Sequence, residues 1–339
     1  MYLENKDGKV FILPFLVLFV PFISVIITAY NRKEFLLEAV NSALNQTLSK
    51  DEYEIIVVKN FSEYDDILKN LDVKTVFVNE ENQGPQIVDA LPYAEGEVIC
   101  FLDDDDVWVP WKLEKVKEAF KEESLCYYHH ALLVFKQGEN VSELIDKLKE
   151  NNKEFTRKRI VDLSPVNSSS TCIKKDILVK YVSQLKKVIR FIDNFYYYFA
   201  LIENCKIKFD PVILTLYRQH YHNSSALKEK SFQDWLKKKA TFYSNRYELL
   251  LELISSCKSE GIRDTVVKAL LAQALSDKIT VTRLSKDGPL KANFRDYLKY
   301  VSLDYKNLKG ILLASLIFMP KSIQLYVVRK WYEKEQKAS

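Results

Sequence analysis

The chain has 339 residues, of which 47% are hydrophobic and 28% are charged, and this composition argues against a disordered protein. Lys and Arg number 50 against 46 Asp and Glu, a formal net charge of +4, so the chain does not belong to the strongly basic class of nucleic-acid-binding proteins. The five cysteines are scattered and form no C-x-x-C pair. Their spacing argues against a zinc site and a disulfide framework, and we expect buried free thiols in a reducing compartment.

An apolar run opens the chain over residues 10–20. The basic residues before it are offset by acidic ones, and no small-residue cleavage site follows it, so it does not read as a signal peptide. Pro14 and Pro21 would break a transmembrane helix, which needs about 20 apolar residues. We expect residues 1–21 to form an apolar N-terminal extension, with a membrane contact as the alternative.

Apolar strands and helical patterns alternate over the next eighty residues. Short β-branched runs predict buried strands at 22–27, 54–58, 74–78 and 98–102. Helical spacing predicts helices at 34–48, 64–71 and 84–94. This alternation predicts an α/β fold, with a parallel sheet covered on both faces and ligands at the carboxyl ends of the strands.

The alternation loosens after residue 103. We expect a helix at 111–121, strands at 125–135, 168–173 and 206–216, and helices beginning at 176 and spanning 188–203. From about residue 231 the pattern is mostly helical. We therefore predict one α/β domain over residues 22–226 and a helical C-terminal region over residues 227–339.

Four adjacent aspartates, Asp103 to Asp106, directly follow the predicted strand 98–102. Their carboxylates repel one another unless they share a cation. Mg²⁺ and Mn²⁺ prefer oxygen ligands and often bind a substrate's phosphates at the same time. Because the run stands at the end of a buried strand, we predict a Mn²⁺ or Mg²⁺ site; the alternative is a solvated acidic turn.

Residues 22–225 resemble the family 2 glycosyltransferases of the GT-A fold. Three segments carry the resemblance: SVIITAYNR at 24–32, with the helix AVNSALNQT and the strand EIIVV after it; GEVICFLDDDDVWVPWKL at 96–113, which is similar to the D-x-D segment of the family; and YRQHYHNSS at 217–225. The resemblance implies a GT-A domain that transfers a sugar, with inversion, from a nucleoside diphosphate sugar to a hydroxyl of a glycan or lipid-linked saccharide.

The resemblance also implies roles for single residues. Asp103 and Asp105 would hold the metal, and Asp103 would also contact the nucleotide. The other residues expected at the nucleotide sugar are Thr28, Tyr30, Asn31, Asn60, Asp104, Arg218 and His220. The chain departs from the family where an acidic pair usually follows the second strand, because it has Lys59 and Asn60 there, and this leaves the nucleotide base undefined.

Asp193 is the candidate general base for the acceptor hydroxyl. It stands where the family places an acidic residue that opens a helix, although the acidic residue that usually precedes it is Ile192 here. An apolar flank would raise the pKa of the Asp193 carboxyl and suit it to accept a proton. The alternative is an Asp that merely caps the helix.

The C-terminal sequence is consistent with two structural interpretations. Residues 310–319 are apolar, Pro320 interrupts them, and residues 322–332 are amphipathic with Lys and Arg around them. This pattern suits a peripheral membrane contact through 310–332 or a packed helix pair. We expect a cytoplasmic protein, which the first reading would place on the inner face of the cell membrane.

Two other functions stay open. A sugar-phosphate nucleotidyltransferase would use the same cation, but it normally carries a Gly-rich phosphate loop, and residues 28–32 contain no Gly. A catalytically degenerate family member could instead act as a membrane-associated assembly subunit.

Overall fold

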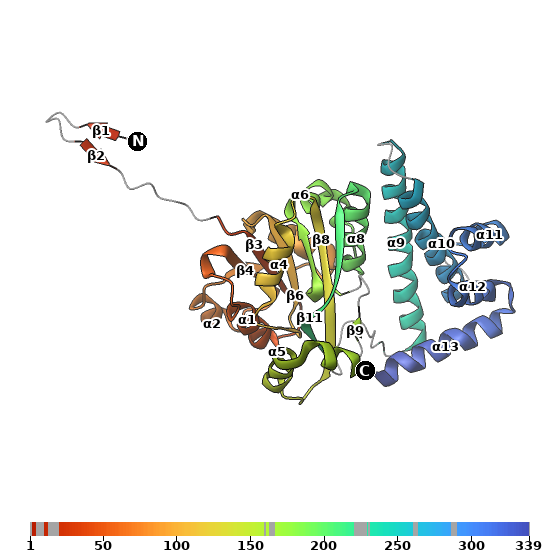
Figure 1. Cartoon of the computed structure of the whole chain (residues 1–339). Helices are drawn as coiled ribbons and strands as arrows, with labels where there is room; N and C mark the ends of the chain where they lie inside the picture. Colours follow the sequence, from red (N-terminus) through yellow and green to blue (C-terminus); the bar gives the residue numbers. More distant parts are fainter. Residues whose placement is uncertain are drawn as a thin grey trace.

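The computed structural model describes residues 2–4, 10–12, 20–158, 161–162, 167–219, 229, 231–259, 264–285 and 290–338. Strands β1 (Tyr2–Glu4) and β2 (Val10–Ile12) pair with each other in the N-terminal extension. The remaining strands form one mixed sheet, and a group of long helices lies on one side of it (Figure 1).

The sheet has the strand order β5-β4-β3-β6-β10-β8-β11-β7, and β9 pairs with β8. Its first four strands are parallel, as expected, whereas β10 runs antiparallel to both β6 and β8. The bounds are β3 (Ile23–Ala29), β4 (Tyr53–Lys59), β5 (Lys74–Phe77), β6 (Val98–Asp103), β7 (Val107–Trp108), β8 (Leu125–Lys136), β9 (Val161–Asp162), β10 (Thr171–Lys174) and β11 (Lys206–Gln219).

Helices cover both faces of the sheet. Val25 and Ile27 of β3 lie in one apolar cluster and Ile26 lies in another, because successive side chains of a strand point to opposite faces. The first cluster includes residues of α1 (Leu36–Leu44), α4 (Lys112–Phe120) and α5 (Val141–Lys158). The second includes residues of α3 (Gln83–Ala90), α6 (Lys175–Lys180), α7 (Val182–Leu185) and α8 (Ile192–Glu203). The short elements α2 (Asp65–Lys69), η1 (Lys50–Glu52), η2 (Leu91–Tyr93) and η3 (Ser168–Ser170) join the strands.

The C-terminal region consists of helices, as expected. They are α9 (Phe232–Ser259), α10 (Asp264–Leu284), α11 (Phe294–Leu303), α12 (Leu308–Ser315), η4 (Leu316–Phe318) and α13 (Lys321–Ala338). Leu250, Leu253 and Leu270 share the second apolar cluster with Phe195 and Phe199 of α8, so α9 and α10 pack on the sheet domain. The boundary near Ala226 stays a prediction, because residues 220–228 lie outside the described part.

Pro320 separates α12 and η4 from α13, as the sequence predicted. Asn293 and Asp296 form a capping box at the start of α11, in which each side chain accepts a hydrogen bond from the other residue's N–H group. None of the helices in the described residues is both long and apolar enough to cross a bilayer.

Four cysteines form two disulfides, which corrects the expectation of free thiols. Cys100 and Cys172 lie opposite each other on β6 and β10, with their Cα atoms 4.2 Å apart. Cys126 of β8 pairs with Cys205, which precedes β11, across 5.8 Å between Cα atoms. The partners are 72 and 79 residues apart in sequence, so only the pairing of the strands brings them together. Cys257 is buried and belongs to neither disulfide.

Candidate active site

A cavity of about 570 Å³ lies at the carboxyl ends of β3 and β6. We name it the strand-end cavity. Thr28 of β3 stands opposite Asp103 of β6 in the sheet register, so the turns that leave these two strands meet at one edge. Thr28, Tyr30, Asn31, Asp103 and Asp104, five of the residues expected at the nucleotide sugar, all line the cavity. Its size suits a small organic ligand.

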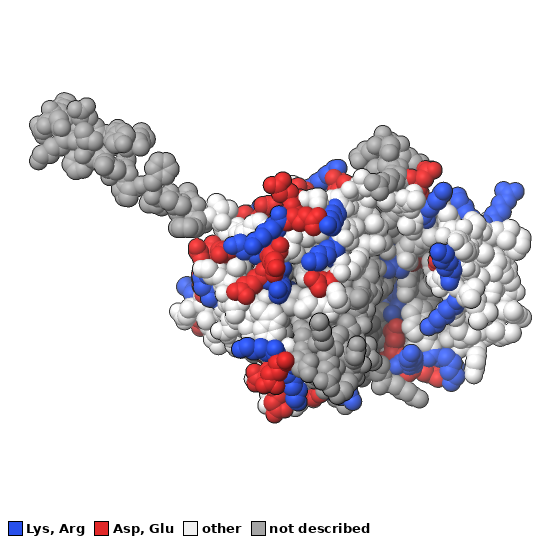
Figure 2. Space-filling model, in the orientation of Figure 1, with Lys and Arg blue, Asp and Glu red and all other residues white. Residues whose placement is uncertain are grey.

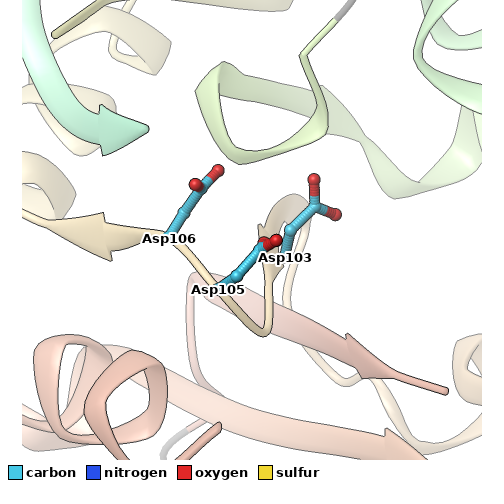
Figure 3. Close-up of side chains that lie close together, drawn as sticks. All are labelled: Asp103, Asp105 and Asp106. Carbon is cyan, nitrogen blue, oxygen red and sulfur yellow. The ribbon is translucent and has the colours of Figure 1, made fainter. Parts of the chain in front are cut away.

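The turn of four aspartates at residues 103–106, which we name the acidic turn, brings three carboxylates together. Oxygen atoms of Asp103, Asp105 and Asp106 lie within 4.8 Å of one another (Figure 3). The predicted metal ligands Asp103 and Asp105 are therefore adjacent in space, and Asp106 joins them. Asp104 points elsewhere and pairs with Arg32, which also approaches an Asp105 oxygen at 2.8 Å.

Crowding and burial make this turn costly without a cation. Burial and the Asp105 charge raise the pKa of Asp103 to about 8, and burial raises the pKa of Asp104 to about 6, although Arg32 opposes that rise. Burial raises the pKa of Asp106 well above its ordinary value. Asp106 Oδ2 is buried and accepts no hydrogen bond from the described residues. A site with several carboxylates and an unbonded oxygen fits Mn²⁺ or Mg²⁺.

Arg218 holds the acidic turn from the side of β11. Its backbone N–H donates to Asp106 Oδ1 at 3.0 Å, and its Nε donates to the Asp105 carbonyl at 2.9 Å. The guanidinium also pairs with Glu38 and lies over the rings of Phe35 and Phe135. Arg218 is buried and is not part of the cavity lining, so its visible role is to fix the turn that carries the carboxylates.

Two hydrogen bonds between Asn31 and Asn60 join the ends of β3 and β4. The Asn31 N–H donates to Asn60 Oδ1 at 2.8 Å, and Asn60 Nδ2 donates to Asn31 Oδ1 at 2.7 Å. Asn31 has a positive φ of 54°, a conformation that Asn tolerates better than most residues. Asn60 thus reaches the cavity only through Asn31. The neighbouring Lys59 is buried and pairs with Asp65.

Asp193 lies in the first turn of α8, close enough to Asp103 for the two charges to interact. Phe191, which precedes the helix, has a left-handed φ of 64°, and the helix begins at Ile192, four residues later than the sequence predicted. Thr28, Asp103, Ile192 and Tyr196 line one small cavity, which places this turn beside the metal candidates. Burial raises the pKa of Asp193 to about 7, and its charge contributes to the raised pKa of Asp103. A carboxyl with that pKa can accept a proton near neutral pH.

The structure adds site residues that sequence reasoning missed. Arg32 and Arg190 line the strand-end cavity, and so does Phe242 of α9. The Arg190 guanidinium lies 5.2 Å from the Phe242 ring centre and makes no hydrogen bond with the described residues. Arg32 stands inside a motif that the sequence had singled out, whereas nothing in the sequence connects Phe242 to this cavity. The predicted residue His220 lies outside the described residues.

Comparisons with known proteins concern the family and the fold. Residues 24–181 match the model of glycosyl transferase family 2. The crystal structure of Staphylococcus aureus TarS 1–349 in complex with UDP-GlcNAc is similar with a TM-score of 0.57 at 16% identity, over 93% of this chain and 92% of that chain. This likeness confirms the predicted GT-A-like fold with additional C-terminal helices.

Curated relatives match over shorter segments. An uncharacterized glycosyltransferase of Nostoc sp. is 36% identical over 118 residues, which are 32% of this chain and 36% of the relative. The poly(ribitol-phosphate) beta-N-acetylglucosaminyltransferase TarS of S. aureus is 32% identical over 178 residues, 48% of this chain and 30% of the relative. The putative teichuronic acid biosynthesis glycosyltransferase TuaG of Bacillus subtilis is 34% identical over 116 residues, 32% of this chain and 45% of the relative. The chain thus matches less than half the length of each of these three relatives.

Proposed function

We propose that this chain is an inverting glycosyltransferase of family 2 that uses a nucleoside diphosphate sugar, because residues 24–181 match the model of glycosyl transferase family 2. One observation carries the proposal: Asp103, which lines the strand-end cavity, belongs to a cluster of three carboxylates and lies close enough to Asp193 for the two charges to interact. The family match favours this function over the nucleotidyltransferase alternative.

The strand-end cavity would hold the sugar donor. Thr28, Tyr30 and Asn31 would contact the nucleotide from the turn after β3, and Asp103 and Asp105 would hold Mn²⁺ or Mg²⁺ with Asp106 beside them. When bound, the cation supplies positive charge to the diphosphate that leaves. Arg190 lines the same cavity without a hydrogen bond to the described residues, so its guanidinium is placed to bind diphosphate oxygens.

Asp193 would act as the general base. Its carboxylate takes the proton of the acceptor hydroxyl while the acceptor oxygen forms a bond to the anomeric carbon. The bond between that carbon and the diphosphate oxygen breaks in the same step, and the diphosphate carries away the electron pair. The raised pKa of Asp193 and the interaction of its charge with that of Asp103 support this role.

The donor proposal is tested by a thermal-shift screen with Mn²⁺ and sugars linked to UDP, GDP or dTDP. UDP-GlcNAc is the first candidate, because the similar TarS structure contains it. A donor that binds only the folded state raises the melting temperature. No shift with any sugar nucleotide would contradict the proposal.

The base proposal is tested by Asp193→Asn, which keeps the side-chain shape but removes the proton acceptor. We expect unchanged donor affinity and sugar transfer at least about 10²-fold slower. Equal loss of stability with and without donor, together with weakened donor binding, would reduce Asp193 to a helix cap. Complete absence of donor hydrolysis in the wild type despite donor binding would favour the degenerate assembly subunit.

A peripheral membrane contact is the second part of the proposal. Ten large apolar side chains on α11, α12, η4 and α13 and on the turns between them are exposed, and Leu308 and Leu312 are 76% and 70% exposed. We name them the apolar face: Phe294, Leu298, Tyr305, Leu308, Leu312, Leu313, Phe318, Met319, Ile323 and Tyr326. Residues 290–332 contain eight Lys or Arg against two Asp. Figure 2 shows largely uncharged surface over these helices with basic side chains around it.

This arrangement fits the surface of an anionic bilayer on the inner face of the cell membrane. Apolar side chains enter the interface while each nearby Lys or Arg adds about 1 kcal/mol of attraction to anionic lipid. Packing accounts for only the other side of these helices, where Tyr300 and Ala314 contact Leu275 and Ile279 of α10. The glycan or lipid-linked acceptor expected from the sequence would lie at such a surface.

The membrane contact is tested by flotation with phosphatidylglycerol vesicles. Leu308→Glu together with Leu312→Glu should abolish flotation, and added salt should weaken that of the wild type. The matched control is Phe77→Glu, which changes an exposed apolar residue of β5 outside the apolar face. Failure of the wild type to float at low salt would contradict the contact and leave the helix packing as the sole role of this region.

A further inference from the structure

A second groove, of about 770 Å³, lies beside the strand-end cavity. It is formed by α9, the end of α10 and α13, and we name it the helical groove. Ile189 lines both the helical groove and the strand-end cavity. Thr241 of α9 faces the groove while the next residue, Phe242, faces the cavity. The two spaces are therefore neighbours, separated by Ile189 and Phe242.

The lining of the helical groove suits a hydroxylated ligand. Gln233 and Ser285 offer an amide and a hydroxyl that can both donate and accept hydrogen bonds. The Thr241 hydroxyl donates to the Lys237 carbonyl at 3.0 Å and can still accept from a ligand. The Asn245 amide also lines the groove and is held in place by the Ile189 N–H and the Lys187 carbonyl. Leucine side chains from α9, α10 and α13 supply apolar contacts between these polar groups. A saccharide or polyol has the same mixture of hydroxyl groups and C–H surface.

The charges of the groove add a preference for phosphate. Lys237 and Lys321 line it against a single acid, Glu248. Lys237 is exposed and forms no ion pair with the described residues. Lys321 donates to the carbonyls of Thr282 and Arg283 at the end of α10, at 3.1 and 3.2 Å, which holds its ammonium at the groove wall.

Helix α13 connects the helical groove with the apolar face. Lys321 and Leu325 lie four residues apart on one side of the helix and line the groove. Ile323 and Tyr326 of the same helix are exposed and belong to the apolar face. A ligand in the groove would thus lie between the strand-end cavity and the surface proposed to meet the membrane.

We propose that the helical groove is the acceptor subsite and that it binds a hydroxylated chain with phosphodiester groups, whose terminal hydroxyl reaches the strand-end cavity past Ile189. The inference rests on the proposed glycosyltransferase function and adds the class and path of the acceptor. Lys237 would bind a phosphate of that chain, and Thr241 would contact its hydroxyl groups.

The experiment compares Thr241→Trp, which fills the groove, and Lys237→Glu, which reverses its charge, with the control Lys238→Glu. Lys238 is the next residue of α9, is exposed, pairs with Glu229 and does not line the groove. Both groove positions are exposed, so the variants should fold, and their melting temperatures check this. The probe is a short synthetic ribitol phosphate oligomer, supplied free in solution or attached to a lipid in vesicles.

We expect the KM for the oligomer to rise at least about tenfold in Lys237→Glu, the effect of losing one charge-assisted hydrogen bond. Thr241→Trp should lose transfer at least as strongly, whereas Lys238→Glu should resemble the wild type. Donor affinity and donor hydrolysis should stay unchanged in all three variants. A lipid-bound oligomer that is used far better than the free one would identify a membrane-attached acceptor.

The inference is overturned if both groove variants keep the wild-type KM while they bind donor normally, or if the wild type binds donor but not the oligomer in calorimetry. Failure of the proposed function looks different, because the wild type would then bind no sugar nucleotide. In that event oligomer binding measured without donor still decides the groove: weaker binding to Lys237→Glu than to Lys238→Glu supports it, and equal binding refutes it.

Discussion

A buried ion pair between α9 and α10 is hydrogen-bonded to the turn that carries Asp193. Arg246 of α9 donates to the two carboxylate oxygens of Asp277 on α10 at 2.8 and 2.7 Å, and to Asn194 Oδ1 at 2.8 Å. Arg246 is 8% exposed and Asp277 is 1% exposed. The Arg246 guanidinium also lies 4.6 Å from the ring centre of Phe191. Asp277→Ala would remove the counter-charge and leave the guanidinium buried.

Breaking a buried pair by removing one partner costs about 3–5 kcal/mol, and we expect the free energy of unfolding to fall by that amount. The matched control is the double variant Arg246→Met with Asp277→Leu. It removes both charges and should recover most of the stability, less about 1 kcal/mol for the hydrogen bond to Asn194. Denaturant unfolding followed by circular dichroism measures both changes.

Sugar transfer should respond separately, because Arg246 contacts the residue next to Asp193. The double variant should remain folded but have a lower kcat, with donor affinity unchanged. A loss of less than about 1 kcal/mol in Asp277→Ala, the scale of an exposed ion pair, would refute the reasoning that this pair is desolvated and holds the helical region to α8.

Three further predictions concern the sheet domain. Burial raises the pKa of the Asp193 carboxyl to about 7, so the folded protein holds this proton more tightly than the unfolded chain. The resulting stabilisation is present at low pH and is lost as the pH rises through 7. Asp193→Asn should therefore raise the melting temperature, relative to the wild type, more at pH 8 than at pH 5, and an equal effect at both pH values would contradict the pKa shift. Gly84→Ala should lower the free energy of unfolding by about 1–3 kcal/mol in a denaturant titration, because a Cβ at this position would lie 1.9 Å from the Leu185 carbonyl oxygen. A variant as stable as the wild type would show that the backbone around Gly84 can move away from Leu185 at little cost. Asp105→Ala should abolish Mn²⁺-dependent donor binding in calorimetry. Its melting temperature without metal should equal or exceed that of the wild type, because one of the crowded carboxylates is gone. Unchanged donor affinity would show that Asp105 is not a metal ligand.

The sequence predicted the part of the site that depends on local pattern. Buried β-branched runs formed β3 and β6, and parallel pairing placed the residues after each strand at one edge, so Thr28, Asn31 and Asp103 line the same cavity. The acidic turn followed from four carboxylates at a strand end. Asp106 was visible in that run, but the D-x-D resemblance drew the interpretation to Asp103 and Asp105.

The rest depends on contacts between distant segments. Phe242 reaches the strand-end cavity only because α9 packs on α8 through apolar contacts, and helical periodicity cannot show which helix faces which cavity. Arg218 was expected at the donor, yet it is sandwiched between Phe35 and Phe135 and bonded to the acidic turn. The sequence did not predict the disulfides, because the spacing of the cysteines does not show that β6 pairs with β10.

The most direct test of the central claim is the release of nucleoside diphosphate from sugar nucleotides by the wild-type chain, measured with Mn²⁺ and with the metal removed by a chelator. We expect release from at least one donor, with UDP-GlcNAc tried first, and this release should require the metal and fall at least about 10²-fold in Asp193→Asn. Release that proceeds equally without metal, or that is unchanged in Asp193→Asn, would contradict the roles assigned to the acidic turn and to α8.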